Sequence, residues 1–166
     1  MTKVVVTGHD DLIGPWVMDK LSATWLPGES VSIGLMDIAE DGKGEILAGV
    51  LYEDFNQANV MCHIAAVPGR NWLNRHFLWY IFYYPFVQLK CHRITVVVAD
   101  TNADCRNFVT SLGFELEATL KDAHPKGDLL VYKILADNCK WWKLNLKGIP
   151  PCNSLPFSTD SSGTTA

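Results

Sequence analysis

The stretch CHRITVVVADTNADCRNFVTSLGFELEATL, residues 91–120, decides the fold. Its early part, Arg93–Ala99, is β-branched almost throughout, which is typical of a strand buried on both faces. Asn102 can cap a helix that follows, and Gly113 is suited to a left-handed cap at that helix's end. The residues from Phe114 to Leu120 then predict another strand. The stretch therefore predicts a strand, a helix and a strand in succession.

A further strand and helix precede this stretch. Val60–Val67 is an apolar run that carries one histidine, and Pro68-Gly69 ends it. Over residues 71–89 the apolar side chains recur at multiples of four, which predicts a helix that Pro85 kinks or ends. Strand, helix and strand in this order predict a right-handed crossover between two parallel strands, Val60–Val67 and Arg93–Ala99.

The other elements are predicted on both sides of this crossover. Lys3–Thr7 reads as a strand, and a helix runs from Asp10 to about Leu21. Val31–Ile38 and Ile46–Tyr52 form an antiparallel hairpin, and Leu129–Leu135 is the last strand. The sequence thus predicts an α/β (α+β) domain with a mixed, mostly antiparallel sheet, a central parallel strand pair and flanking helices.

Length and composition limit the kind of protein. The 166 residues fit one domain, which we place at residues 1–142, with a flexible C-terminal tail at residues 143–166 that is rich in Ser, Thr, Pro and Gly. The formal net charge of −4 argues against a nucleic-acid partner, which needs clustered Lys and Arg. No apolar run has the roughly 20 residues of a membrane helix.

The cysteine pattern indicates a reducing compartment. The five cysteines contain no CxxC pair, so they fit neither a disulfide framework nor a zinc site. The N-terminal residues lack the apolar core of a signal peptide. We therefore expect a cytoplasmic protein without a bound metal.

The junction after Pro68-Gly69 is the strongest local candidate for a binding site. The predicted helix begins there with RNWLNR, residues 70–75. The first turn of a helix has unpaired backbone N–H groups and a positive dipole end, so it favours an anion such as pyrophosphate. Arg70 and Arg75 add positive charge. The alternative is that both arginines are solvated at an ordinary helix start.

The segment from His63 to Tyr132 resembles the acetyl-CoA-binding half of the GNAT superfamily of N-acetyltransferases. The similarity lies in the strand with a basic residue at its start, the Asn after it, the helix, and Leu112-Gly113-Phe114 followed by acidic residues. The resemblance is nearest to the ribosomal-protein N-terminal acetyltransferase branch and to small bacteriophage-encoded relatives. It implies a GNAT fold and acetyl transfer from acetyl-CoA to a primary amine of a protein or small molecule, without a metal.

The resemblance also implies the cofactor-binding residues. The strand would splay from its parallel neighbour so that the backbone of Ala65, Ala66 and Val67 lines the pantetheine arm. Asn102 would contact the cofactor, and Phe108 would pack near the arm. The pyrophosphate would be surrounded by Arg70, Asn71, Trp72, Leu73, Asn74 and Arg75.

The sequence departs from the family pattern in two places. Trp72, Leu73 and Asn74 stand where the pyrophosphate loop usually has small residues, so side-chain cations would take over part of the binding. Val109 stands where many members have a tyrosine that protonates the leaving thiolate. Solvent or another group must supply that proton, or catalysis must proceed without it.

His63 is the candidate for the proton path, because its ordinary pKa lies near neutrality and its strand carries it toward the expected thioester. The alternative is a structural histidine that bonds a neighbouring strand. Glu53 and Asp54 are rival bases acting through water. A backbone N–H near Ala65 or Ala66 could polarise the thioester carbonyl. Cys62 adjoins His63 but points to the opposite face, which disfavours a covalent cysteine mechanism.

Two other functions remain open from the sequence. One is a non-catalytic GNAT-like interaction module, such as a phage protein that binds a host partner in the host cytoplasm. The other is a toxin that acetylates charged transfer RNA, which the acidic balance disfavours. A homodimer also stays open. The segments expected to shape the acceptor pocket, residues 10–25 and 122–128, carry no specificity pattern.

Overall fold

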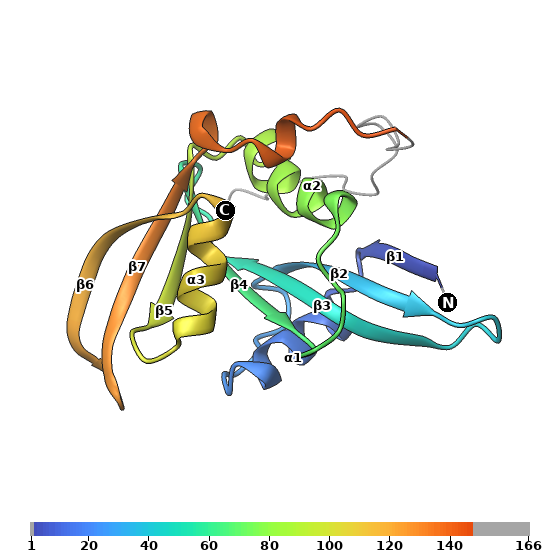
Figure 1. Ribbon diagram of the computed structural model, residues 1–166, viewed down its shortest axis with the longest axis horizontal. Coiled ribbons are helices and arrows are strands. Elements are labelled where there is room, and N and C mark those ends of the chain that lie inside the picture. The colour runs from blue at the N-terminus through green and yellow to red at the C-terminus, as the bar shows by residue number, and fades with distance from the viewer. Residues whose placement is uncertain (1, 148–166) are drawn as a thin grey trace, which may run out of the picture.

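The computed structural model describes residues 2–147, and the predicted tail therefore lies mostly outside the described residues. The domain boundary at residue 142 remains a prediction. The described chain contains ten main elements (Figure 1): β1 Thr2–Thr7, α1 Asp10–Lys20, β2 Val31–Ile38, β3 Gly44–Glu53, β4 Asn59–Ala66, α2 Arg75–Tyr83, β5 Arg93–Ala99, α3 Ala103–Leu112, β6 Glu115–His124 and β7 Gly127–Leu135.

The strands form one seven-stranded sheet in the order β1-β2-β3-β4-β5-β7-β6. Neighbouring strands are antiparallel except for β4 and β5, which are parallel. The predicted mixed sheet with a central parallel pair is therefore confirmed. The β4–α2–β5 crossover places the two parallel strands side by side in the middle of the sheet.

Helices cover both faces of the sheet. Ile13 and Val17 of α1 pack with Leu51 of β3 in one apolar cluster, whereas the neighbouring Val50 belongs to a second cluster that includes Phe77 of α2. Adjacent strand residues point to opposite faces, so α1 and α2 lie on opposite sides. The close approach of α1 needs Gly49, because a Cβ there would lie 2.6 Å from Val17 Cγ2.

The helix predicted over residues 71–89 begins later than expected. The side chain of Asn74 accepts a hydrogen bond of 2.8 Å from the backbone N–H of Phe77, and this cap starts α2 at Arg75. Residues 70–74 are therefore loop rather than the first helical turn. After Tyr83 the chain continues as a π-helical turn, Tyr84–Gln88, around Pro85, which has no N–H for a regular helix.

The described chain ends in two short 3₁₀ helices, Ala136–Asn138 and Trp141–Lys143. The indole N–H of Trp141 donates to the carbonyl of Leu112 at 2.7 Å, which fastens this end of the chain to α3. Among residues 2–147, we find no helix with the length and hydropathy of a membrane span.

Candidate functional site

The parallel pair β4–β5 separates soon after it begins. Its three register partners are Asn59 with Arg93, Val60 with Ile94, and Met61 with Thr95. Farther along, β5 still pairs with β7, and β4 still pairs with β3 as far as Ala66. Figure 1 shows the two strands diverging. The facing edge of residues 62–66 thus has no strand partner within the described chain.

A cavity of about 800 Å³ lies at this divergence. Most of its wall comes from four parts of the fold: the open end of β4, the facing part of β5, the loop before α2, and the first two turns of α3. The main wall residues are Cys62, His63, Ile64, Ala66, Pro68, Trp72, Val96, Val97, Val98, Ala99, Asn102, Cys105, Phe108 and Val109. A cleft of this size with mostly apolar walls is suited to an extended small molecule.

Five of the residues predicted to form the site meet at this cavity: His63, Ala66, Trp72, Asn102 and Phe108. The rings of Trp72 and Phe108 are in contact, with centroids 5.3 Å apart. They join the loop before α2 to α3 as one aromatic wall. The side-chain oxygen of Asn102 accepts a hydrogen bond of 3.0 Å from Cys105 N, so it is the cap of α3.

The other predicted residues lie outside the cavity walls. Ala65 packs against α1, and the N–H of Val67 donates to Leu47 O at 2.8 Å. Arg70 forms ion pairs with Glu45 at 3.1 Å and Asp37 at 3.4 Å, so its guanidinium is engaged by β2 and β3. Asn71, Leu73, Asn74 and Arg75 likewise do not border the cavity.

The shifted helix start changes the predicted anion site. The first turn of α2 begins at Arg75, and the Asn74 side chain already occupies one of its backbone N–H groups. Of the two arginines, Arg75 therefore lies at the helix end, whereas Arg70 is held by carboxylates in the preceding loop. The sequence pattern could not show this, because the carboxylates come from a distant hairpin.

His63 is held by Glu53. Its Nε2 lies 2.6 Å from Glu53 Oε1, and the two side chains are 27% and 31% exposed. The register places Glu53 opposite Met61, so both side chains lie on the same face of the β3–β4 pair. A carboxylate only accepts hydrogen bonds, so Nε2 carries the proton and Nδ1 of the neutral ring keeps its lone pair.

Cys62 differs from its neighbour in both direction and chemistry. It is the register partner of Tyr52, on the opposite face from His63. Burial raises the pKa of the Cys62 thiol, and the nearby Cys105 raises it further. The thiol form therefore predominates at neutral pH, which agrees with the expectation that this cysteine is no nucleophile.

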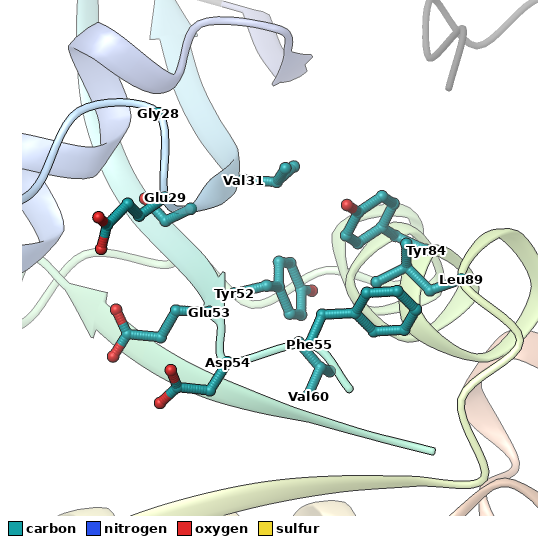
Figure 2. Close-up of a pocket in the computed structure, with 11 residues that line it drawn as sticks. Gly28, Glu29, Val31, Tyr52, Glu53, Asp54, Phe55, Val60, Tyr84 and Leu89 are labelled. Carbon is teal, nitrogen blue, oxygen red and sulfur yellow. The ribbon is translucent and has the colours of Figure 1, made fainter. Parts of the chain in front are cut away.

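A smaller cavity of about 200 Å³ lies at the end of β3. Figure 2 shows the rings of Tyr52, Phe55 and Tyr84 on one side of the strand and the carboxylates of Glu53 and Asp54 on the other. Because Glu53 borders this cavity and also bonds His63, it connects the smaller cavity to the larger one.

Several further residues border the large cavity that no sequence motif singled out. They are Lys20–Ala23 at the end of α1, together with His124 and Leu129 on either side of the β6–β7 turn. His124 Nδ1 accepts a hydrogen bond from Lys126 N at 3.2 Å. All of these positions except Leu129 fall in the two segments predicted to shape the acceptor pocket. No cluster of three metal-ligating side chains occurs among residues 2–147.

Comparisons with known proteins identify the fold of this chain. Neither protein-family models nor curated protein sequences match this chain. Solved structures of the spermidine/spermine N-acetyltransferase SpeG from Vibrio cholerae do match. A mutant form has a TM-score of 0.65 and 14% identity, covering 86% of this chain and 98% of its own. The chain has the GNAT fold.

A second SpeG structure, in complex with manganese ions, agrees with the first. Its TM-score is 0.62 at 13% identity, and the match covers 80% of this chain and 92% of that chain. Structural similarity at this low sequence identity establishes the GNAT fold but does not identify the acceptor. The predicted fold class is thus confirmed, while the nearness to the ribosomal-protein or phage branch stays a prediction.

Proposed function

We propose that this protein is an acetyl-CoA-dependent N-acetyltransferase that moves an acetyl group to a primary amine by direct attack. The proposal rests on the cavity where β4 and β5 separate, with His63 in its wall and Glu53 bonded to that histidine. The solved structures of the same fold are named N-acetyltransferases, which supports the same chemistry here.

The cavity offers acetyl-CoA two kinds of surface. The open edge of residues 62–66 presents main-chain N–H and C=O groups that can pair with the amides of the pantetheine arm, as an added strand would. Trp72 and Phe108 give the arm an apolar wall. Arg75 at the start of α2 is the cation that we assign to the pyrophosphate.

His63 accepts the proton that the reaction releases. The attacking amine must be neutral, and Nδ1 of His63 has the free lone pair because Glu53 holds Nε2–H. As the amine nitrogen bonds to the acetyl carbon, its proton passes to Nδ1, and the Glu53 carboxylate stabilises the resulting imidazolium. An unpaired N–H of β4 polarises the acetyl carbonyl.

The leaving group also needs a proton. Val109 lines the cavity, but its side chain has no acidic proton. The thiolate must therefore be protonated by water or by the imidazolium of His63. In the second case the proton from the amine ends on the CoA sulfur. The carbon–sulfur bond breaks as the carbon–nitrogen bond is completed, and the histidine returns to its starting form.

The acceptor is tested with a panel of amines. Purified protein is mixed with acetyl-CoA and, separately, spermidine, a peptide with a free N-terminus, a lysine peptide, and an aminoglycoside, and free CoA thiol is measured. We expect release with at least one amine and loss of that release in His63→Ala. No release with any amine, or equal release by His63→Ala, would contradict the assigned chemistry.

A second candidate is the non-catalytic interaction module. It is favoured by the bulky residues Trp72, Leu73 and Asn74 in the loop and by the engagement of Arg70 with Asp37 and Glu45. Both features make the pyrophosphate harder to hold. Titration with acetyl-CoA separates the two functions, because a pure interaction module has no need to bind it.

A further inference from the structure

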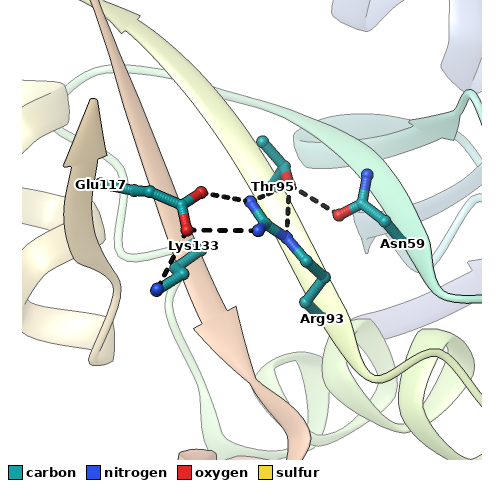
Figure 3. Close-up of polar contacts among 5 residues, drawn as sticks. All are labelled: Asn59, Arg93, Thr95, Glu117 and Lys133. Atoms are coloured by element: carbon teal, nitrogen blue, oxygen red, sulfur yellow. Dashed lines mark hydrogen bonds and ion pairs between the residues drawn. The ribbon is translucent and has the colours of Figure 1, made fainter. Parts of the chain in front are cut away.

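A polar network joins four strands beside the last register pairs of β4 and β5. It consists of Asn59 on β4, Arg93 and Thr95 on β5, Glu117 on β6 and Lys133 on β7 (Figure 3). Thr95 and Met61 are the last register partners before β4 and β5 separate. The network therefore lies at the position where the parting begins, two residues before His63.

The hydroxyl of Thr95 is the centre of this network. It is buried, with Thr95 only 6% exposed, and it accepts hydrogen bonds from Arg93 Nε at 3.2 Å and Nη2 at 3.0 Å. A hydroxyl has two lone pairs and one proton. Because Arg93 fills the acceptor side, the proton is directed to Asn59 Oδ1, 2.6 Å away.

Arg93 is itself held by the outer strands. Its Nη2 lies 2.7 Å from Glu117 Oε2, and its Nη1 lies 3.3 Å from Oε1. Lys133 Nζ donates to the same carboxylate at 3.0 Å. Glu117 on β6 and Lys133 on β7 thus fix the position of Arg93, which orients the Thr95 hydroxyl toward Asn59 on β4.

This bond reinforces a short contact. Between the half-sheet β1–β4 and the half-sheet β5–β7–β6, the ladder has three register pairs. The main chain adds bonds from His92 N and Arg93 N to Ala58 O, at 2.8 and 3.1 Å. A ladder this short opens easily at its end, so one buried side-chain bond beside the last pair has a large influence on where the strands part.

We propose that Thr95 and Asn59 are positioning residues that fix the point where β4 and β5 part, with Arg93 orienting the Thr95 hydroxyl. The inference rests on the proposed function, because the parted strands form the acetyl-CoA cavity. If the pair Met61–Thr95 opens, the edge that receives the pantetheine arm moves, and His63 moves with it relative to the thioester.

The test uses Thr95→Val, which keeps the shape and removes the hydroxyl, and Thr95→Ser, which restores the hydroxyl. Thr119→Val on the exposed strand β6 is the matched control. Amide hydrogen exchange of Val60, the middle register position between β4 and β5, is measured without cofactor, and acetyl-CoA affinity is measured by titration. We expect Thr95→Val to exchange about five- to tenfold faster and to bind acetyl-CoA more weakly by a similar factor.

Thr95→Ser and Thr119→Val should both stay near wild type in exchange and affinity. Asn59→Ala removes the acceptor from the other strand and should reproduce the Thr95→Val result, which guards against a folding defect peculiar to one site. The inference would be overturned if Thr95→Val exchanged at the wild-type rate, or if Thr95→Ser exchanged as fast as Thr95→Val. Fast exchange in Thr95→Val together with no acetyl-CoA binding by wild type would support the positioning role of Thr95 and Asn59 and overturn the proposed function.

Discussion

Glu53 and His63 face each other across the β3–β4 pair, with 2.6 Å between Oε1 and Nε2. The pair is partly buried, and its histidine borders the large cavity whereas its carboxylate borders the smaller one. A carboxylate that holds one imidazole nitrogen fixes the tautomer and makes the other nitrogen the base. We therefore propose that the two side chains act together as one acid–base unit.

The first prediction concerns this unit. We expect His63→Ala to lower kcat by about 100-fold, the usual contribution of a positioned general base. Glu53→Gln keeps a hydrogen-bond acceptor but loses the charge that stabilises the imidazolium, so its kcat should fall by about tenfold. Neither change should alter acetyl-CoA affinity by more than about twofold. Steady-state kinetics and titration measure both quantities.

Glu29→Gln is the matched control, because Glu29 is an exposed carboxylate of the smaller cavity. It should keep the wild-type kcat. If Glu29→Gln and Glu53→Gln lose activity equally, the effect belongs to the charge of the region and not to the bond with His63.

The second prediction separates the two arginines near the start of α2. Arg75→Ala should weaken acetyl-CoA binding about tenfold and leave stability almost unchanged, because a phosphate contact to one cation contributes about 1.5–3 kcal/mol. Arg70→Ala should leave cofactor affinity near wild type. Titration calorimetry with acetyl-CoA compares the two variants, and equal affinity of Arg75→Ala and wild type would remove the pyrophosphate from this helix end.

Arg70→Ala should instead lower the free energy of unfolding. Its partner Asp37 has a side chain only 9% exposed, and Asp37 Oδ1 is buried without a hydrogen bond among the described residues. Removing the guanidinium leaves this carboxylate uncompensated, at a cost of about 1–3 kcal/mol. Urea denaturation of Arg70→Ala and of the double variant Arg70→Ala/Asp37→Asn tests this, because the neutral asparagine should recover part of the stability lost in Arg70→Ala.

The third prediction concerns Cys62. Because burial raises the pKa of its thiol, the thiolate is scarce at neutral pH and alkylation should be slow. Mass spectrometry after iodoacetamide treatment of the native protein should find Cys62 unmodified, and denaturation should make it reactive. Cys62→Ala should retain turnover, whereas loss of turnover in a folded Cys62→Ala protein would revive a covalent mechanism.

The fourth prediction is a pH dependence of stability. Hydrogen bonds from Arg93 and then Lys133 hold the pKa of Glu117 below its ordinary value of 4.5. A depressed pKa in the folded state means that the stabilisation is present above 4.5 and is lost as the pH falls through the lower folded value. Glu117→Gln should therefore show less acid destabilisation below pH 4.5 than wild type. Parallel stability curves for the two proteins would contradict this.

The strands were predictable because their local signals agree with their final environment. Val31–Ile38 matches β2 to the residue, and the β-branched run Arg93–Ala99 matches β5, which lies between two other strands. The start of α2 was not predictable from the sequence. A helix could begin after Pro68-Gly69 or after Asn74, and only Asn74 makes the capping hydrogen bond. A local pattern cannot rank two such signals.

The site was predictable only in part for a related reason. The divergence of β4 and β5 was expected from the resemblance, and the structure places the last pair at Met61–Thr95. The bond between Glu53 and His63 depends on the β3–β4 register, and the capture of Arg70 by Asp37 depends on a hairpin more than thirty positions away. Neither contact can therefore be predicted from the spacing of residues in the sequence.

Isothermal titration with acetyl-CoA tests the central claim most directly, when wild type is compared with Ala66→Trp. Ala66 borders the cavity on the open edge of β4, so an indole there fills the space between the parted strands. We predict that wild type binds acetyl-CoA at one site with a Kd between about 1 μM and 1 mM, and that folded Ala66→Trp shows no binding heat. Absence of binding by wild type at millimolar acetyl-CoA, or equal binding by both proteins, would contradict the account.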